Sequence, residues 1–369
     1  MGVRLITASP RAALPNEQAS GRLAASPRAI SPDVQDQSFT HTHRLPANLA
    51  ATRPPGTSVH LFTHSACLQH DTGAGHAERP ARLEAVNAAL REAFPQLPWT
   101  EAPRATRGQL LRVHEDALLR LVLDTPVTSA IALDPDTVLS QGSAEAALRA
   151  AGAGVAAVDA VMIGVEQREP LPRAFCAVRP PGHHATPAVA MGFCLFNNIA
   201  VAAAHALDAH GLERVAIVDF DVHHGNGTQA IFESDPRVLY LSSHQMPLYP
   251  DTGYSSERGV GNIVNAGLRP GTSGEAFRES WESTLLPAID AFRPQLLFVS
   301  AGFDAHRLDP LAQLQLEADD YAWLTTELVT LANRHARGRL ISMLEGGYDL
   351  DALRESSVAH VRALMAAPR

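Results

Sequence analysis

The sequence contains no lysine, and all 30 of its basic residues are arginine. With 39 acidic residues the formal net charge is −9, and neither sign of charge forms a long run. This distribution argues against direct binding of nucleic acid, because surfaces that bind nucleic acid concentrate basic residues. Since alanine is abundant, we interpret the missing lysine as compositional bias.

Cysteine is also scarce, with three residues and no Cys-x-x-Cys pair: Cys67, Cys176 and Cys194. Disulfides and thiolate metal sites are therefore not expected, and a reducing, cytoplasmic location is predicted. The apolar stretch 144–165 carries Glu145, Arg149 and Asp159, so we expect no membrane span. A chain of 369 residues, 46% of them hydrophobic, is long enough for one large α/β domain or two small ones.

Residues 1–57 lack hydrophobic periodicity and are rich in proline, serine, alanine and arginine. We interpret them as a disordered N-terminal extension. An organelle transit peptide would share the arginine, but Glu17, Asp33 and Asp36 weaken that alternative. The ordered domain is predicted to span residues 58–369.

The ordered part alternates strand and helix patterns, which is typical of βαβ units and a parallel sheet. Strands are predicted at 58–63, 174–178, 215–218, 238–242, 296–300 and 340–344. Helices are predicted from Pro80 onward and at 108–123, 143–165, 197–210 and 317–337. Gly211 and Gly338 provide stop signals for the last two helices.

Residues 215–227 combine a strand with a metal-binding pattern. The run Val-Ala-Ile-Val is typical of a strand that is buried on both faces of a parallel sheet. Asp219, Asp221 and His223 follow at a spacing of two, so they project from one face of an extended segment. Ligands bind at the carboxyl ends of strands in open α/β sheets, and carboxylates and imidazole suit a hard or borderline cation. The stretch therefore predicts a metal site.

Loops with polar residues and glycines follow four of the predicted strands. They are Arg-Pro-Pro-Gly-His-His (179–184), residues 219–227, Ala-Gly-Phe-Asp-Ala-His (301–306) and Glu-Gly-Gly-Tyr (345–348). Each loop alone has an ordinary explanation, since aspartates often cap helices and paired histidines often hydrogen-bond in a core. Four such loops at the strand ends of one sheet instead indicate an active site.

These motifs resemble those of the zinc-dependent histone deacetylase family, closest to its class II-like and acetylpolyamine amidohydrolase branches. The likeness runs from about residue 58 to the end and includes Met-Gly-Phe-Cys-Leu-Phe-Asn-Asn at 191–198. It implies the three-layer, arginase/deacetylase-like α/β fold, a central parallel sheet with helices on both faces. Residues 58–369 would then form one deacetylase-like catalytic domain.

The resemblance implies one zinc ion per chain, held by Asp221, His223 and Asp304. Three protein ligands leave a coordination position open for water and substrate, as in other catalytic zinc sites. The family also has a structural potassium site. Asp219 and Asp221, with backbone carbonyls at His223 and near Ser242, resemble its ligands.

The resemblance also implies the catalytic groups. His183 and His184 match tandem histidines that take a proton as zinc-bound water attacks an amide carbonyl and donate one to the leaving amine. Tyr348 matches the tyrosine that hydrogen-bonds the developing oxyanion. Asp219 and Asn226 match the partners of the two imidazoles. Because a carboxylate raises histidine basicity more than an amide does, we expect His184 to be the base and His183 to be protonated.

Gly192 and Phe193 resemble residues that line a narrow acyl-lysine channel, and Tyr249 is a candidate for its opposite wall. The expected activity is removal of acetyl or other short acyl groups from lysine side chains of peptides or proteins, or from related small amines. An acetylpolyamine deacetylase is the alternative. The acidic gatekeeper of some polyamine-selective relatives is replaced by Leu311, which weakens that alternative. The sequence leaves open whether the chain forms a homo-oligomer.

Two further alternatives remain. A binuclear manganese ureohydrolase shares the fold but needs bridging carboxylates where this chain has Gly225 and His306. A non-catalytic acyl-lysine binder would be expected to have lost the tyrosine, a histidine or a metal ligand, and none of these is missing.

Overall fold

The structure is a computed structural model that describes residues 59–166 and 173–366. The predicted extension at residues 1–57 lies outside the described residues. The domain boundary at residue 58 is therefore still a prediction.

An eight-stranded parallel sheet forms the centre of the described chain. Its strands lie in the order β2-β1-β5-β10-β9-β6-β7-β8, and each neighbouring pair runs parallel. They are β1 (Val59–Thr63), β2 (Trp99–Glu101), β5 (Arg173–Cys176), β6 (Val215–Asp219), β7 (Val238–Gln245), β8 (Ile263–Leu268), β9 (Leu296–Ala301) and β10 (Leu340–Leu344). A short antiparallel pair, β3 (Ile131–Ala132) and β4 (Val138–Leu139), lies apart from this sheet.

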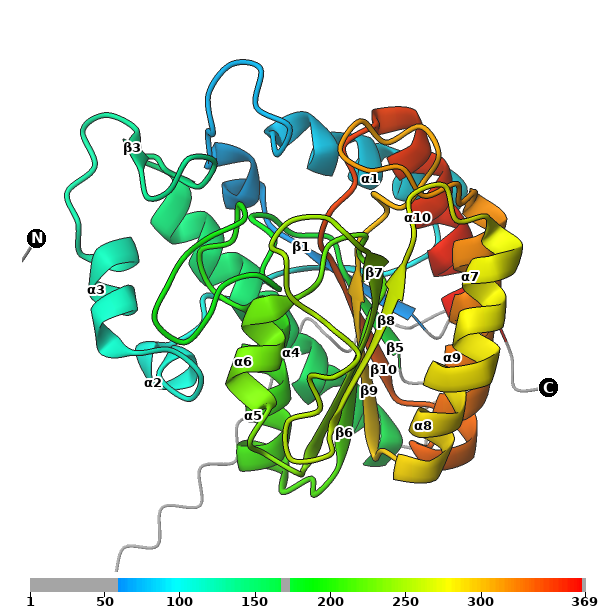
Figure 1. Cartoon of the computed structure of the whole chain (residues 1–369). Helices are drawn as coiled ribbons and strands as arrows, with labels where there is room; N and C mark the ends of the chain where they lie inside the picture. The colour runs from blue at the N-terminus through cyan, green and yellow to red at the C-terminus, as the bar shows by residue number, and fades with distance from the viewer. Residues whose placement is uncertain (1–58, 167–172, 367–369) are drawn as a thin grey trace, which may run out of the picture. The chain divides into compact units, whose positions relative to one another are not determined.

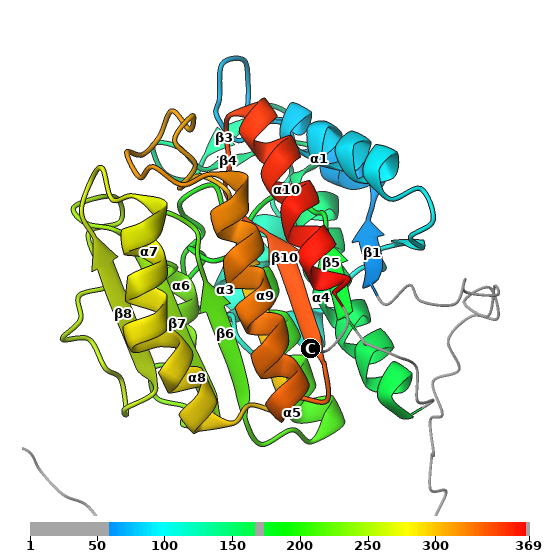
Figure 2. The same cartoon turned by 90° about the vertical axis from the view of Figure 1, so that its right-hand side faces the viewer.

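Helices cover both faces of the sheet. Figures 1 and 2 show α7, α8, α9 and α10 on one face and α4, α5 and α6 on the other. The helices are α1 (Pro80–Ala93), α2 (Arg107–Leu110), α3 (Asp116–Leu123), α4 (Ser143–Glu166), α5 (Asn198–His210), α6 (Asn226–Phe232), α7 (Gly274–Ser280), α8 (Leu286–Phe292), α9 (Ala318–His335) and α10 (Leu350–Leu364). A 3₁₀ turn, η2 (Ser65–Gln69), and a π-helical turn, η3 (Trp281–Leu285), complete the elements. The predicted three-layer α/β architecture is confirmed.

Most predicted elements agree with the structure to within a few residues. The run Val-Ala-Ile-Val forms β6, which is buried along its whole length between two neighbouring strands. Helix α5 ends at Gly211, whose φ of 62° is left-handed, as the stop signal predicts. Strands β2 and β8 were not predicted. Their short or mixed sequences lack the continuous apolar run that marks the central strands.

The prediction of one helix over residues 108–123 is wrong, because the structure has two helices, α2 and α3. The break falls where tertiary hydrogen bonds compete with helix formation. The ring of His114 is buried and accepts a hydrogen bond from the backbone N–H of Asn197 at 2.8 Å. The backbone N–H of Glu115 donates to the carbonyl of Pro187 at 2.8 Å instead of to a helical carbonyl.

Among the described residues, one helix is long and apolar enough by length and composition to cross a membrane, namely residues 143–164 of α4. Most of its apolar window is buried inside the protein, and α4 packs against α5 and η2. Core helices commonly pass this test, so it is weak evidence for a membrane span.

Candidate active site

The four predicted loops follow strands that are immediate neighbours, in the order β5-β10-β9-β6. All four strands are parallel, so their carboxyl ends lie at one edge of the sheet. The loops therefore meet there, at the position where open α/β sheets bind ligands.

Asp221, His223 and Asp304 converge in a buried cluster, the first Asp–His cluster. The Nδ1 atom of His223 lies 3.1 Å from Asp221 Oδ1 and 3.1 Å from Asp304 Oδ2. All three residues are buried, and their ligand atoms lie within 4.8 Å of one another. Two carboxylates and one imidazole form a donor set that suits a borderline divalent cation.

Backbone N–H groups orient the two carboxylates of this cluster. Gly346 N–H donates to Asp221 Oδ2 at 2.8 Å, and Val222 N–H donates to Asp304 Oδ1 at 2.8 Å. At Gly302 a Cβ atom would lie 2.0 Å from Asp221 Oδ2, so the motif requires glycine there. Such outer hydrogen bonds hold metal ligands in position, and the residues present fit a cation.

His183 and His184 lie side by side next to this cluster, with ring centroids 4.0 Å apart and ring planes tilted by 48°. Each ring is anchored through Nδ1 by a different partner. His183 Nδ1 lies 3.0 Å from Asp219 Oδ2, and His184 Nδ1 lies 2.8 Å from Asn226 Oδ1. In both residues Nδ1–H donates to the oxygen, which leaves Nε2 for other chemistry.

The two partners differ in charge, and the two imidazoles differ accordingly. Burial disfavours the charged form of both rings, but Asp221 and Asp219 raise the pKa of His183 to about 10. Burial and the positive charges of His183 and His223 hold the pKa of His184 well below its usual value. A cation held by Asp221 would oppose part of that carboxylate's effect on His183, whereas Asp219 acts with or without it.

Tyr348 lies at the same edge of the sheet. Its backbone N–H donates to Asp309 Oδ2 at 2.7 Å, and the guanidinium carbon of Arg82 lies 4.8 Å from its ring centroid. The Tyr348 ring is 5.8 Å from the ring of Phe193. Burial raises the pKa of the Tyr348 hydroxyl well above its usual value, so this hydroxyl remains a proton donor at neutral pH.

The three residues predicted to line an acyl-lysine channel lie near the candidate site, and the channel itself stays a prediction. A Cβ atom at Gly192 would lie 2.5 Å from the His184 ring, and the φ of 56° at Gly192 also favours glycine. Phe193 follows and packs edge-on against His76 with centroids 4.9 Å apart. Tyr249 is 40% exposed, and its ring is 5.2 Å from that of His184.

The structure also identifies supporting residues that were not predicted. Glu345 is fully buried, and its Oε2 accepts hydrogen bonds from the backbone N–H groups of Gly182 at 2.6 Å and His183 at 3.2 Å. The Arg82 guanidinium donates to the carbonyls of Glu345 and Gly347. Contacts to backbone atoms leave no sequence pattern. The one available signal was that glutamate opens the Glu-Gly-Gly-Tyr loop.

A binuclear enzyme would need bridging carboxylates at the positions of Gly225 and His306, and neither position could supply one here. A Cβ atom at Gly225 would lie 2.2 Å from Asp219 Oδ2, so no longer side chain fits there without displacing that carboxylate. The Nε2 atom of His306 lies 2.9 Å from Glu355 Oε1 on α10. Both observations disfavour the binuclear alternative.

The fold and the site define an α/β enzyme with a candidate metal centre. A family model described as "Histone deacetylase domain" matches residues 76–364, and the chain belongs to this family. The family is metal-dependent, and its named members include deacetylases and amidohydrolases. The predicted family membership is therefore confirmed.

Individual relatives support the same assignment. A histone deacetylase-like amidohydrolase of Pseudomonas aeruginosa is 41% identical over 289 residues, which cover 76% of this chain and 74% of that protein. Polyamine deacetylase HDAC10 of Homo sapiens is 38% identical over 309 residues, which cover 79% of this chain and 45% of that protein. The crystal structure of the HDA15 HD domain is 36% identical, with a TM-score of 0.78, covering 84% of this chain and 90% of that one. The predicted deacetylase-like fold is confirmed.

Proposed function

We propose that the protein is a zinc-dependent deacetylase that removes acetyl or other short acyl groups from lysine side chains or related small amines. The observation that supports this best is the asymmetry of the tandem histidines beside the first Asp–His cluster. One imidazole is paired with the carboxylate of Asp219 and the other with the amide of Asn226. Such a difference suits one group for accepting a proton and the other for donating one.

Asp221, His223 and Asp304 would hold one zinc ion per chain. When bound, zinc supplies Lewis acidity that polarises an amide carbonyl and makes water a stronger acid. A buried donor set with an open position fits a catalytic rather than a structural zinc site. The blocked position at Gly225 favours a single ion.

His184 would act as the general base, because its lowered pKa keeps Nε2 free of a proton at neutral pH. His183, whose pKa is raised by carboxylates, would carry a proton and donate it to the leaving amine. The hydroxyl of Tyr348 would donate a hydrogen bond to the carbonyl oxygen as negative charge develops on it. Glu345 would keep the backbone of the histidine pair in register with the cation ligands.

The substrate class remains a choice between acyl-lysine and acetylpolyamine. Burial raises the pKa of Tyr249 and the nearby Asp136 adds to the effect, so negative charge lies near the candidate channel wall. Negative charge there would attract a cationic substrate of either class. A named relative is a polyamine deacetylase, whereas Leu311 at the gatekeeper position favours acyl-lysine.

The test compares turnover of an acetyl-lysine peptide with turnover of N-acetylputrescine. We expect hydrolysis of the peptide to be faster, to stop on chelation and to be restored by zinc. The change Tyr348→Phe should lower kcat about 100-fold or more, because it removes an oxyanion donor while the zinc content is unchanged. A wild-type protein that binds both compounds but hydrolyses neither would be a binder rather than an enzyme.

Three further expectations remain proposals. The cysteines at 67, 176 and 194 are all free and buried, which supports a reducing, cytoplasmic location. Ser242 lies opposite Asp219 in the β6–β7 register, as a potassium site using backbone carbonyls would need. Light scattering would measure whether the protein forms a homo-oligomer.

A further inference from the structure

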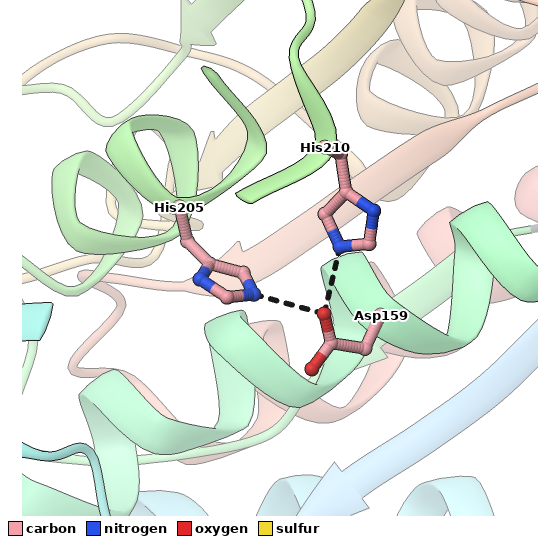
Figure 3. A group of neighbouring side chains, drawn as sticks. All are labelled: Asp159, His205 and His210. Carbon is pink, nitrogen blue, oxygen red and sulfur yellow. Dashed lines mark hydrogen bonds and ion pairs between the residues drawn. The ribbon is translucent and has the colours of Figure 1, made fainter. Parts of the chain in front are cut away.

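A second Asp–His cluster lies between helices α4 and α5, away from the active site. It consists of Asp159 on α4 and of His205 and His210 on α5. Figure 3 shows both imidazole rings directed at one oxygen of the carboxylate. The Nε2 atoms of His205 and His210 each lie 2.8 Å from Asp159 Oδ1.

We propose that this second Asp–His cluster is a structural binding site for a borderline divalent cation of the zinc class. Two imidazole nitrogens and one carboxylate oxygen are donors that such ions prefer, and all three atoms lie within 4.8 Å of one another. Tetrahedral zinc with bonds of roughly 2.0–2.1 Å places its ligand atoms about 3.3 Å apart. The two nitrogen–oxygen distances of 2.8 Å therefore need to open by only about half an ångström to admit the ion.

The three side chains of this cluster differ in how much they are exposed to solvent, and the difference suits a bound ion. The side chains of His205, His210 and Asp159 are 10%, 23% and 37% exposed. The imidazoles are thus held in place by the protein, while the carboxylate faces solvent. An ion can enter from that side, and water can complete its coordination.

Arg112 fixes the protonation of His205, and this protonation must change before an ion can bind. Its Nη1 donates to His205 Nδ1 at 3.0 Å, so His205 carries its proton on Nε2 and donates it to Asp159. An ion on Nε2 requires the proton to move to Nδ1, and Arg112 must then withdraw. Its Nε atom already lies 3.0 Å from Asp208 Oδ2, which offers the guanidinium an alternative partner.

The location indicates a structural role. Helix α5 has 13 residues, so its two ends are roughly 20 Å apart. At its first turn, Asn198 donates to Pro180 O at 3.0 Å, and Asn197 at the N-cap donates to Ala185 O at 3.2 Å, on either side of the tandem histidines. His205 and His210 lie seven and twelve residues beyond Asn198, roughly 10 and 18 Å along the helix, so an ion there would link α5 to α4 away from the tandem histidines.

The experiment counts zinc bound per chain as zinc is added stepwise to chelator-treated protein. We expect two ions per wild-type chain, and one ion per chain for His205→Gln/His210→Gln. Asp159→Asn should also lose the second ion. Because it keeps a hydrogen-bond acceptor for the imidazoles, it tests the proposal even if the double variant does not fold. Asp304→Ala should instead lose the first ion and retain the second.

Matched variants separate a built site from a chance contact. His335 lies 2.7 Å from Asp290 Oδ1 but shares it with Arg334 rather than with a second imidazole. His335→Ala should therefore still bind two ions. Arg112→Gln should bind the second ion more tightly, because it removes a positive charge and frees His205 Nδ1. A wild type whose single ion is lost in Asp304→Ala, or two ions retained by Asp159→Asn, would overturn the proposal.

Discussion

The two Asp–His clusters contain the same kinds of donors but differ in how the fold surrounds them. The first is carried by loops at strand ends, is buried, and has its carboxylates fixed by backbone N–H groups. The second is carried by two helices, is partly exposed, and has its carboxylate fixed by the imidazoles themselves. The same donor types can therefore occur in a buried, preorganised setting, which suits a reactive centre, or in a partly exposed one, which suits a structural role.

The ionisation of the carboxylates follows the same difference. Burial raises the pKa of Asp304 to about 6, and the nearby Asp221 adds to the effect. Partial burial acts in the same direction on Asp159, but hydrogen bonds from His205 and His210 outweigh it and lower its pKa below the usual range. Within the first cluster Asp221 behaves differently from Asp304, because the charges of His183 and His223 outweigh burial and lower the pKa of Asp221 below its usual range. The first cluster therefore holds one carboxylate of raised and one of lowered pKa, whereas the single carboxylate of the second is stabilised by both of its imidazoles.

The largest expected difference between the clusters is in catalysis. Asp304→Ala should lower kcat/KM for an acetyl-lysine peptide roughly 1,000-fold or more, because it removes a ligand of the proposed zinc ion. Asp159→Ala should lower it far less, since its cluster lies in the C-terminal half of α5, away from the tandem histidines. Circular dichroism would verify that both variants fold. Equal losses in the two variants would show that the clusters are not functionally separate.

A smaller effect is expected on the pH dependence of catalysis at the tandem histidines beside the first cluster. In Asn226→Asp a carboxylate replaces the amide beside His184, and an adjacent anion raises the pKa of an imidazole by about 1–2 units. Because the proposed base must be unprotonated, the acidic limb of the pH–rate profile should move to higher pH. His335→Ala should leave that limb in place. An unmoved limb in Asn226→Asp would contradict the assignment of His184 as base.

The smallest expected effect concerns stability at the second cluster. In metal-free protein at pH 7, Asp159→Ala should lower the free energy of unfolding by about 1–2 kcal/mol, because two hydrogen bonds are lost. The pKa of Asp159 is depressed by folding, so this contribution is present above the unfolded pKa and is lost as the pH falls through the folded pKa. Urea unfolding at pH 7 would measure the change. Asp290 is more exposed than Asp159, so Asp290→Ala should lower the free energy of unfolding by less. An equal loss in both variants would show that the second cluster adds no particular stability.

The sequence predicted the fold where local signals were strong. The apolar run at 215–218 and the alternation of strands with long helices were sufficient for the parallel sheet. The prediction failed between α2 and α3, because the hydrogen bonds that break the helix come from Pro187 and Asn197, far away in the chain. No local pattern encodes those partners.

The candidate site was predictable to a similar degree. Motifs at strand ends predicted the candidate cation ligands, the tandem histidines and Tyr348, and the fold brings these residues to one edge of the sheet. Arg82, Asp309 and Glu345 were not predicted, because they form hydrogen bonds with backbone atoms of other loops. The second Asp–His cluster was not predicted either. Asp159 precedes His205 by 46 residues and meets it only when α4 packs against α5.

By itself, the sequence determined the alternation of elements, the residues at the ends of the strands and the family to which they belong. These features depend on hydrophobic periodicity and on short motifs, which act over a few neighbouring residues. The tertiary structure decided the order of the strands, the contacts of Glu345 and Arg82 with the backbone of the site loops, and the meeting of α4 and α5 at a second donor set. These depend on burial and on distances between segments far apart in the chain, which only packing establishes.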